Sequence, residues 1–184
     1  MLAEDKNDKR ISRHHITQED FTPSSVVNEL VDKLSPDVFV DFSKKILDTS
    51  AGVGNLLIEV LNRRLKNCDT ITDVFNAISS IYGVEIMADN VCECRERLYN
   101  KIVERFPSII NDKILDYEVK RLLKINIVWY DSLLYDFSFP QKIHHYDLKN
   151  GNVNVLFTEK DKSKGKGKYP MWTTEQEHIQ LKLF

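Results

Sequence analysis

The sequence predicts an α/β fold with a shortened, mainly parallel sheet. Three short apolar runs, at about 45–48, 81–86 and 125–129, have the length and composition of buried strands. Stretches with helical spacing of apolar residues lie between them, and this alternation is typical of a parallel sheet. The chain has 184 residues, 42% of them hydrophobic and 29% charged, so we expect one main domain with a sizeable core.

Five segments carry a helical pattern of apolar residues: about 23–34, 56–65, 70–79, 90–106 and 112–123. We expect Thr22 to cap the first helix, with Pro23 in its first turn and Ser35-Pro36 after its end. The spacing of Asn90 and Glu93 predicts a capping box at the start of the fourth helix.

The composition changes along the chain and predicts three parts. Residues 1–20 are polar and charged and are expected to form a flexible arm ahead of a domain over 21–159. Residues 160–184 are expected to be a basic linker and a C-terminal tail, because KDKSKGKGK fills 160–168. Inside the domain, Asn150-Gly151 separates two runs of alternating character, which predicts a β-hairpin.

Charge and cysteine content limit the class of protein. The net charge of −2 gives the whole chain no attraction for nucleic acid, so a DNA-binding role requires a local basic patch. We expect no membrane span and no signal peptide, and hence a cytoplasmic protein, because no apolar run reaches about 18 residues. Three cysteines favour reduced thiols, and the Cys92-x-Cys94 spacing is too tight for the usual zinc site, so no metal is expected.

A loop rich in small residues follows the first predicted strand and contains Gly52-Val53-Gly54. Glycine lets a backbone turn tightly and lets a ligand approach without a Cβ clash. A dinucleotide-binding loop would have a third glycine at position 57, where this chain has leucine, and the Gly-Lys-Ser/Thr of a phosphate-binding loop is absent. The loop therefore predicts a crevice for a nucleoside rather than for a phosphate group.

An acidic residue, Glu85, lies at the end of the predicted strand that follows this loop along the chain. A carboxylate at this place in an α/β fold can accept both hydroxyl groups of a ribose. The alternative is a solvated acid at a strand end, but the order of glycine loop and acid favours the ribose.

Four motifs follow one another along the chain: Phe21-Thr22-Pro23 with Val26-Val27 and Leu30, Asp48-Thr49-Ser50-Ala51-Gly52-Val53-Gly54-Asn55, Tyr82-Gly83-Val84-Glu85-Ile86, and Asn126-Ile127-Val128-Trp129-Tyr130-Asp131-Ser132-Leu133. On these motifs, residues 21–132 resemble the S-adenosylmethionine-dependent methyltransferases that modify adenine N6 in DNA, particularly those of type I and type II restriction-modification systems. Thr49 departs from the family, which commonly has proline there.

The resemblance implies a Rossmann-like class I methyltransferase sandwich, S-adenosylmethionine as cofactor and DNA as partner. It implies that the cofactor is lined by Phe21, Thr22, Asp48, Ser50, Gly52, Gly54, Glu85, Ile86 and Asp131. For Asp131 the alternative is an ordinary turn acid at a strand end.

The family's catalytic motif, Asn/Asp-Pro-Pro-aromatic, is missing, so no catalytic residue is assigned. The chain has no Pro-Pro, and after Asp131 its prolines are Pro140 and Pro170. Tyr146 with Asp147 is a candidate for a divergent substitute. The interpretations left open are a shortened, divergent enzyme completed by a partner subunit or a second copy, a catalytically silent interaction module, and a small-molecule methyltransferase.

The last five residues are Gln180, Leu181, Lys182, Leu183 and Phe184. They resemble the pentapeptide by which bacterial proteins dock on the DNA polymerase sliding clamp. In that interpretation Leu183 and Phe184 enter an apolar pocket while Gln180 makes a polar contact. The alternative is a short amphipathic end that packs back on the domain.

Overall fold

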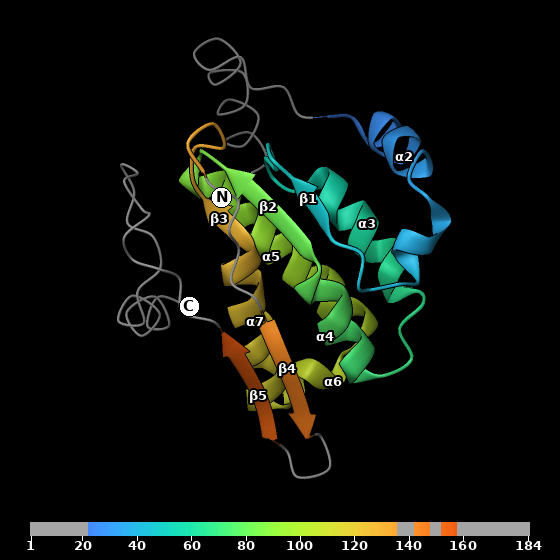
Figure 1. The fold of residues 1–184 in the computed structure, drawn as a ribbon, viewed down its shortest axis with the longest axis vertical. Coiled ribbons are helices and arrows are strands. Elements are labelled where there is room, and N and C mark those ends of the chain that lie inside the picture. Colours follow the sequence, from blue (N-terminus) through green and yellow to red (C-terminus); the bar gives the residue numbers. More distant parts are fainter. Residues whose placement is uncertain (1–21, 136–141, 148–151, 158–184) are drawn as a thin grey trace.

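The structure is a computed structural model that describes residues 22–135 together with the strands 142–147 and 152–157. It is a mixed α/β fold, and its described residues contain six α-helices and a three-stranded parallel sheet (Figure 1). The sheet has the order β1 (Ile46–Asp48), β2 (Ile81–Glu85), β3 (Ile127–Trp129). The predicted α/β class with a short parallel sheet is therefore confirmed.

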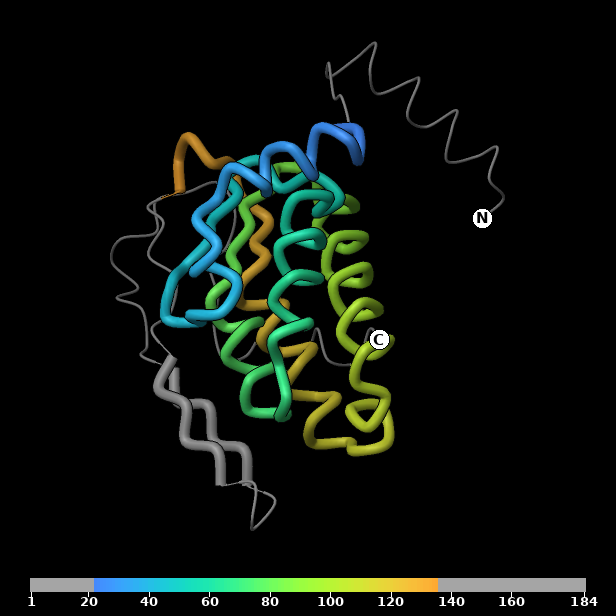
Figure 2. The backbone as a smooth tube through the Cα atoms, turned by 90° about the vertical axis from the view of Figure 1, so that its right-hand side faces the viewer, coloured from blue at the N-terminus to red at the C-terminus, as the bar shows by residue number. Residues whose placement is uncertain are grey.

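The helices connect these strands and are α2 (Ser24–Asp32), α3 (Asn55–Leu65), α4 (Ile71–Ser79), α5 (Ala88–Arg105), α6 (Ser108–Asn111) and α7 (Lys113–Asn126), with the 3₁₀ turn η1 (Pro36–Phe39). Helices α3 and α5 cover one face of the sheet, as Figure 2 shows, and α2 lies against α3. The contact at Gly83 is close: a Cβ there would lie 2.9 Å from Leu57 Cδ1 of α3 and 3.2 Å from Ile127 Cδ1 of β3. Glycine in the central strand thus lets α3 approach the sheet.

Apolar side chains fill the space between this face and the helices. The largest buried side chains include Leu57 and Leu61 of α3, Phe75 of α4, Leu98 of α5 and Leu122 of α7. Successive strand residues point to opposite faces. A second, smaller cluster therefore lies on the other face of the sheet.

The smaller cluster contains Val84, Val128, Tyr130 and Tyr135. The ring centroids of Tyr130 and Tyr135 lie 5.1 Å apart with the planes tilted by 50°. This arrangement folds the segment after β3 back over the sheet.

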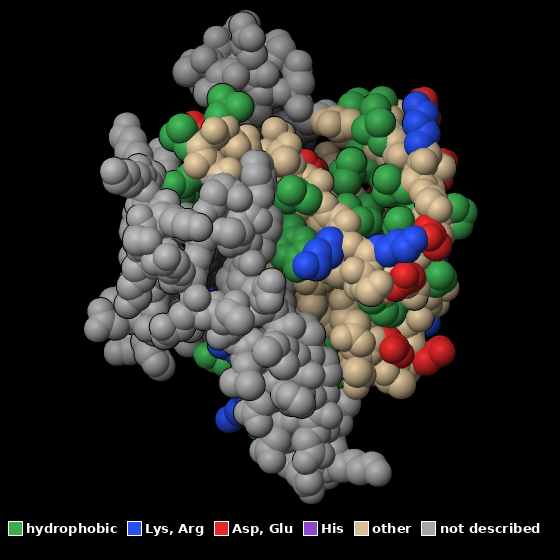
Figure 3. All heavy atoms as spheres, viewed as in Figure 1, with side chains coloured by type: hydrophobic (Ala, Val, Ile, Leu, Met, Phe, Trp, Pro, Cys, Tyr) green, Lys and Arg blue, Asp and Glu red, His purple; other side chains and the backbone are tan. Residues whose placement is uncertain are grey.

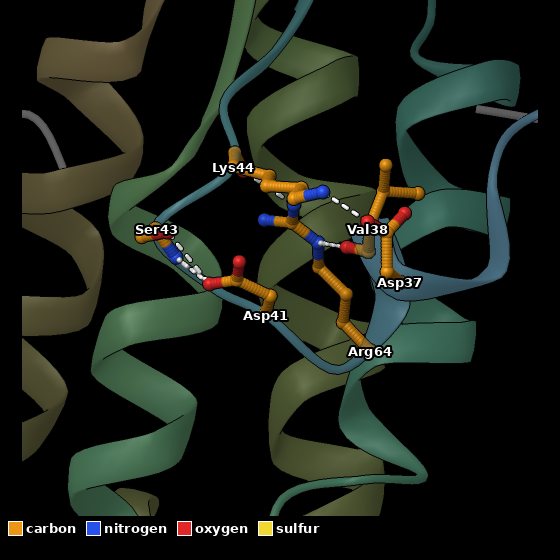
Figure 4. A network of polar contacts seen from close by, with 6 residues as sticks. All are labelled: Asp37, Val38, Asp41, Ser43, Lys44 and Arg64. Carbon is orange, nitrogen blue, oxygen red and sulfur yellow. Dashed lines mark hydrogen bonds and ion pairs between the residues drawn. The ribbon is translucent and has the colours of Figure 1, made fainter.

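A buried arginine joins the elements around β1 (Figure 4). Arg64 on α3 has no exposed surface. Its Nε donates to the Val38 carbonyl at 3.0 Å, its Nη2 to the Lys44 carbonyl at 2.7 Å and its Nη1 to the Ser80 hydroxyl. Burial lowers the pKa of this guanidinium. Arg64 therefore ties η1, the approach to β1 and the end of α4 to one point on α3.

Two predicted helix caps are wrong. Helix α2 begins at Ser24 with Pro23 as its N-cap residue, and no side chain caps it, so Thr22 lies outside the helix. Helix α5 begins at Ala88, and Asn90 is buried within its first turn instead of capping it. The capping box that does form joins Thr70 and Asp73 at the start of α4.

The predicted hairpin is confirmed. Strands β4 (Lys142–Asp147) and β5 (Asn152–Phe157) pair antiparallel in a separate two-stranded sheet. The turn at 148–151, the arm 1–20 and the tail 160–184 lie outside the described residues. Across the described part of the chain, no helix combines the length and apolar character that a membrane crossing needs.

Candidate functional site

The loop between β1 and α3 is held tightly by its own backbone. The Gly54 amide donates to the Ala51 carbonyl at 2.8 Å, and the Ala51 amide donates to the Val84 carbonyl of β2 at 3.0 Å. At the start of the loop, Asp48 Oδ1 accepts the Ser50 amide at 3.0 Å. These hydrogen bonds fix the loop between the ends of β1 and β2.

The two loop glycines have different roles. Both have positive φ, 51° at Gly52 and 84° at Gly54, a conformation that other residues adopt at a cost. A Cβ on Gly54 would lie 2.5 Å from the buried Cys94 Sγ of α5, whereas a Cβ on Gly52 would meet no atom within 4 Å. Gly54 thus packs the loop onto α5, and Gly52 presents an open stretch of backbone.

Glu85 supports the open part of the loop. Its side chain is only 8% exposed. Its Oε2 accepts the Gly52 amide at 2.8 Å, and its Oε1 accepts the Met87 amide at 2.8 Å. A carboxylate has about four lone-pair sites, so each oxygen can still accept one further donor from a ligand.

Asp48 brings a second carboxylate to the same place. The structure leaves it half-buried at the end of β1. Burial raises the pKa of Asp48, and the negative charge of Glu85 raises it further, against the opposing hydrogen bond from Ser50. We name Asp48, Gly52 and Glu85 the strand-end site. Two neighbouring acids make it a site suited to a cationic or hydroxyl-bearing ligand and unsuited to a phosphate.

Three further residues that were predicted to line the cofactor follow the ends of the strands: Ser50 after β1, Ile86 after β2 and Asp131 after β3. Asp131 Oδ1 accepts the Leu133 amide at 2.9 Å, so this side chain closes its own turn after β3. Ser50 is exposed, and Ile86 is 51% exposed directly after Glu85. The structure therefore brings Asp131 and Ile86 to the carboxyl ends of the sheet.

Contacts of Asn55 bring the start of α2 to the loop. Asn55 Nδ2 donates to the Thr22 carbonyl at 3.1 Å, and Arg97 Nη1 donates to Asn55 Oδ1 at 2.9 Å and to the Val53 carbonyl at 2.7 Å. Thr22, although not a helix cap, thus lies beside the glycine loop. Phe21 and residues 180–184 lie outside the described residues.

The sequence interpretation missed Trp129. It is the register partner of Glu85 in the parallel sheet, it is 46% exposed, and its Nε1 donates to the Ile86 carbonyl at 2.8 Å. Trp129 lies at the end of a predicted strand, and Glu85 ends the predicted strand before it. This placement could have indicated from the sequence that Trp129 lies near Glu85.

The distribution of charged and metal-ligating side chains limits the ligands that the described residues can bind. On the face shown in Figure 3, the described lysine and arginine side chains are interspersed with aspartate and glutamate, so no broad basic surface covers that face of the described residues. Within the described part of the chain, no three His, Cys, Asp or Glu side chains are grouped to hold a metal ion.

No family model, no curated protein and no solved structure matches the chain.

Proposed function

We propose that this protein binds S-adenosylmethionine at the carboxyl ends of β1, β2 and β3, in a Rossmann-like methyltransferase domain related to the DNA adenine-N6 methyltransferases. The observation that carries the proposal is the hydrogen bond from the Gly52 amide to the Glu85 carboxylate. This bond holds the partly exposed Gly52 backbone beside the carboxylate that we propose binds the ribose, at the place where α/β sheets bind nucleosides.

The charge of the strand-end site supports this ligand over a dinucleotide. S-adenosylmethionine carries a sulfonium, an ammonium and one carboxylate group, so its net charge is positive and is attracted by Asp48 and Glu85. A pyrophosphate would be repelled by the same two carboxylates. The remaining lone pairs of Glu85 suit the two ribose hydroxyls.

The reaction that fits the resemblance breaks the bond between the sulfonium sulfur and its methyl group and forms a bond from that methyl group to N6 of an adenine in DNA. S-adenosylhomocysteine leaves, and the amine loses one proton to water. Asp131, which follows β3, is one of the residues that the resemblance assigns to the lining of the cofactor. In this proposal the described residues provide the binding site of the cofactor.

A second candidate is a methyltransferase-like interaction module. The absence of any Pro-Pro, and so of the Asn-Pro-Pro-aromatic motif, favours it. In this alternative Gln180, Leu181, Leu183 and Phe184 dock on the sliding clamp. If the wild type binds the purified clamp and Phe184→Ala does not, the interaction-module alternative is supported. If Phe184→Ala binds the clamp as tightly as the wild type, this alternative is refuted.

The experiment that tests the main proposal is calorimetric titration of the protein with S-adenosylmethionine, with and without duplex DNA. The informative variant is Gly52→Asn. Asparagine tolerates positive φ better than most residues, and its Cβ meets no atom at this position, so the fold should survive. The added side chain would nevertheless occupy the space proposed for the ligand.

We expect Gly52→Asn to bind at least roughly tenfold more weakly, an effect of about 1.4 kcal/mol. The matched control is Ser108→Asn, an exposed position on α6 at the far end of the helical layer. Equal affinity of all three proteins places the ligand elsewhere. If the wild type shows no heat of binding, the proposal of an S-adenosylmethionine site is refuted. An assay of methyl incorporation into DNA is then not needed.

A further inference from the structure

The side chain of Trp129 leaves the sheet on the same face as Glu85. In a parallel sheet, residues that are register partners point to the same side. Glu85 and Trp129 are such partners, and Glu85 binds the Gly52 amide on that side. The indole therefore lies next to the strand-end site.

A hydrogen bond fixes how the indole is oriented. Its Nε1 donates to the carbonyl of Ile86 at 2.8 Å, which holds the ring across the end of β2. Trp129 is nevertheless 46% exposed, and Ile86 beside it is 51% exposed. The indole N–H is bonded within the protein, so the exposed part of the ring offers a ligand an apolar, π-rich surface.

We propose that Trp129 is the base-stacking residue of the strand-end site, and that the site selects a purine nucleoside mainly by stacking. The inference rests on the proposed function, since the ribose at Glu85 determines where the base lies. We place the base of the nucleoside on the Ile86 side of this ribose, because the exposed indole of Trp129 lies there, on the strand next to Glu85. A two-ring purine covers more of the indole than a one-ring pyrimidine does.

Fluorescence can report the contact directly because the chain has two tryptophans, Trp129 and Trp172. In a Trp172→Phe protein the emission comes from Trp129 alone. We would titrate this protein with S-adenosylmethionine, adenosine and uridine, and measure each binding constant by calorimetry in parallel. Saturable quenching by the two adenine ligands, at the calorimetric Kd, and a much weaker effect of uridine are expected.

Two substitutions separate stacking from apolar contact. Trp129→Leu keeps an apolar side chain but removes the ring, and it should weaken adenosine binding by roughly 5- to 150-fold, the range for loss of one stacking partner. Trp129→Phe keeps an aromatic ring and loses the hydrogen bond to the Ile86 carbonyl, so it should retain most of the affinity. Tyr117→Ala, at a 39% exposed aromatic position on α7, is the control for loss of a surface ring. Thermal melting of each variant checks that the fold is kept.

The outcomes distinguish this inference from the proposed function. If S-adenosylmethionine binds but Trp129 emission stays constant, or if Trp129→Leu binds as tightly as the wild type, the stacking role is overturned and the proposed function stands. If adenosine binds and quenches while S-adenosylmethionine does not bind, the proposed function is overturned and the purine site stands. Binding of neither ligand overturns both.

Discussion

Glu85→Gln tests how far the glycine loop depends on one carboxylate. Both oxygens of Glu85 accept backbone amides, from Gly52 and Met87, each at 2.8 Å. Glutamine keeps one oxygen and replaces the other with an NH₂ group, which then faces an N–H donor. One charge-assisted hydrogen bond in a buried setting is lost, a cost of about 1.5–3 kcal/mol. For a chain of this size the melting temperature should fall by roughly 3–12 °C.

The assay is thermal unfolding followed by circular dichroism, without ligand, beside the control Glu96→Gln. Glu96 is exposed on α5, so its neutralisation should shift the melting temperature by less than about 2 °C. Equal melting of Glu85→Gln and the wild type would refute the reasoning, because the two amides would then have no structural need for the carboxylate.

Three further predictions concern residues around the loop and its support. Arg64→Lys should lose about 3 kcal/mol or more of unfolding free energy in urea, because one ammonium group cannot serve three buried carbonyls and a hydroxyl. Gly54→Ala should destabilise by about 2 kcal/mol or more, and adding Cys94→Ala should restore part of the loss in a double-mutant cycle, since the clash is with the Cys94 sulfur. Asp48→Asn should raise the melting temperature at pH 7. That gain should shrink as the pH falls through the raised pKa of Asp48 toward its ordinary value of 3.8, and a pH series of melts checks it.

The parallel sheet could be predicted because its signals are local. Each of β1, β2 and β3 is a short apolar run, and each lies within the range expected from the sequence. The boundary between α7 and β3 was less well predicted, since the helix continues to Asn126 and shortens the strand. The Asn126 side chain donates to the Ile78 carbonyl at 2.8 Å, and Arg95 donates to the Lys124 and Ile127 carbonyls. Both contacts join residues about 30 or more positions apart, so no local pattern reports them.

The candidate site was predictable in part for the same reason. The glycines and the acid at Glu85 are adjacent to strand ends, and their order along the chain is informative. The hydrogen bond between Gly52 and Glu85 depends on the tertiary structure and cannot be read from the sequence. The same holds for the different surroundings of Gly52 and Gly54, which depend on the position of Cys94. Trp129 was missed because a tryptophan in an apolar run is first interpreted as core.

Asp48 connects stability to the proposed ligand. Burial and the charge of Glu85 both disfavour the ionised form of Asp48, so at neutral pH this residue lowers the stability of the fold. A cation bound between Asp48 and Glu85 would reverse that effect, because it would stabilise both negative charges at once. A neutral nucleoside such as adenosine would bring no such compensation. The same substitution, Asp48→Asn, should therefore stabilise the free protein while weakening S-adenosylmethionine more than adenosine, and a carboxylate that served only the fold would show neither difference.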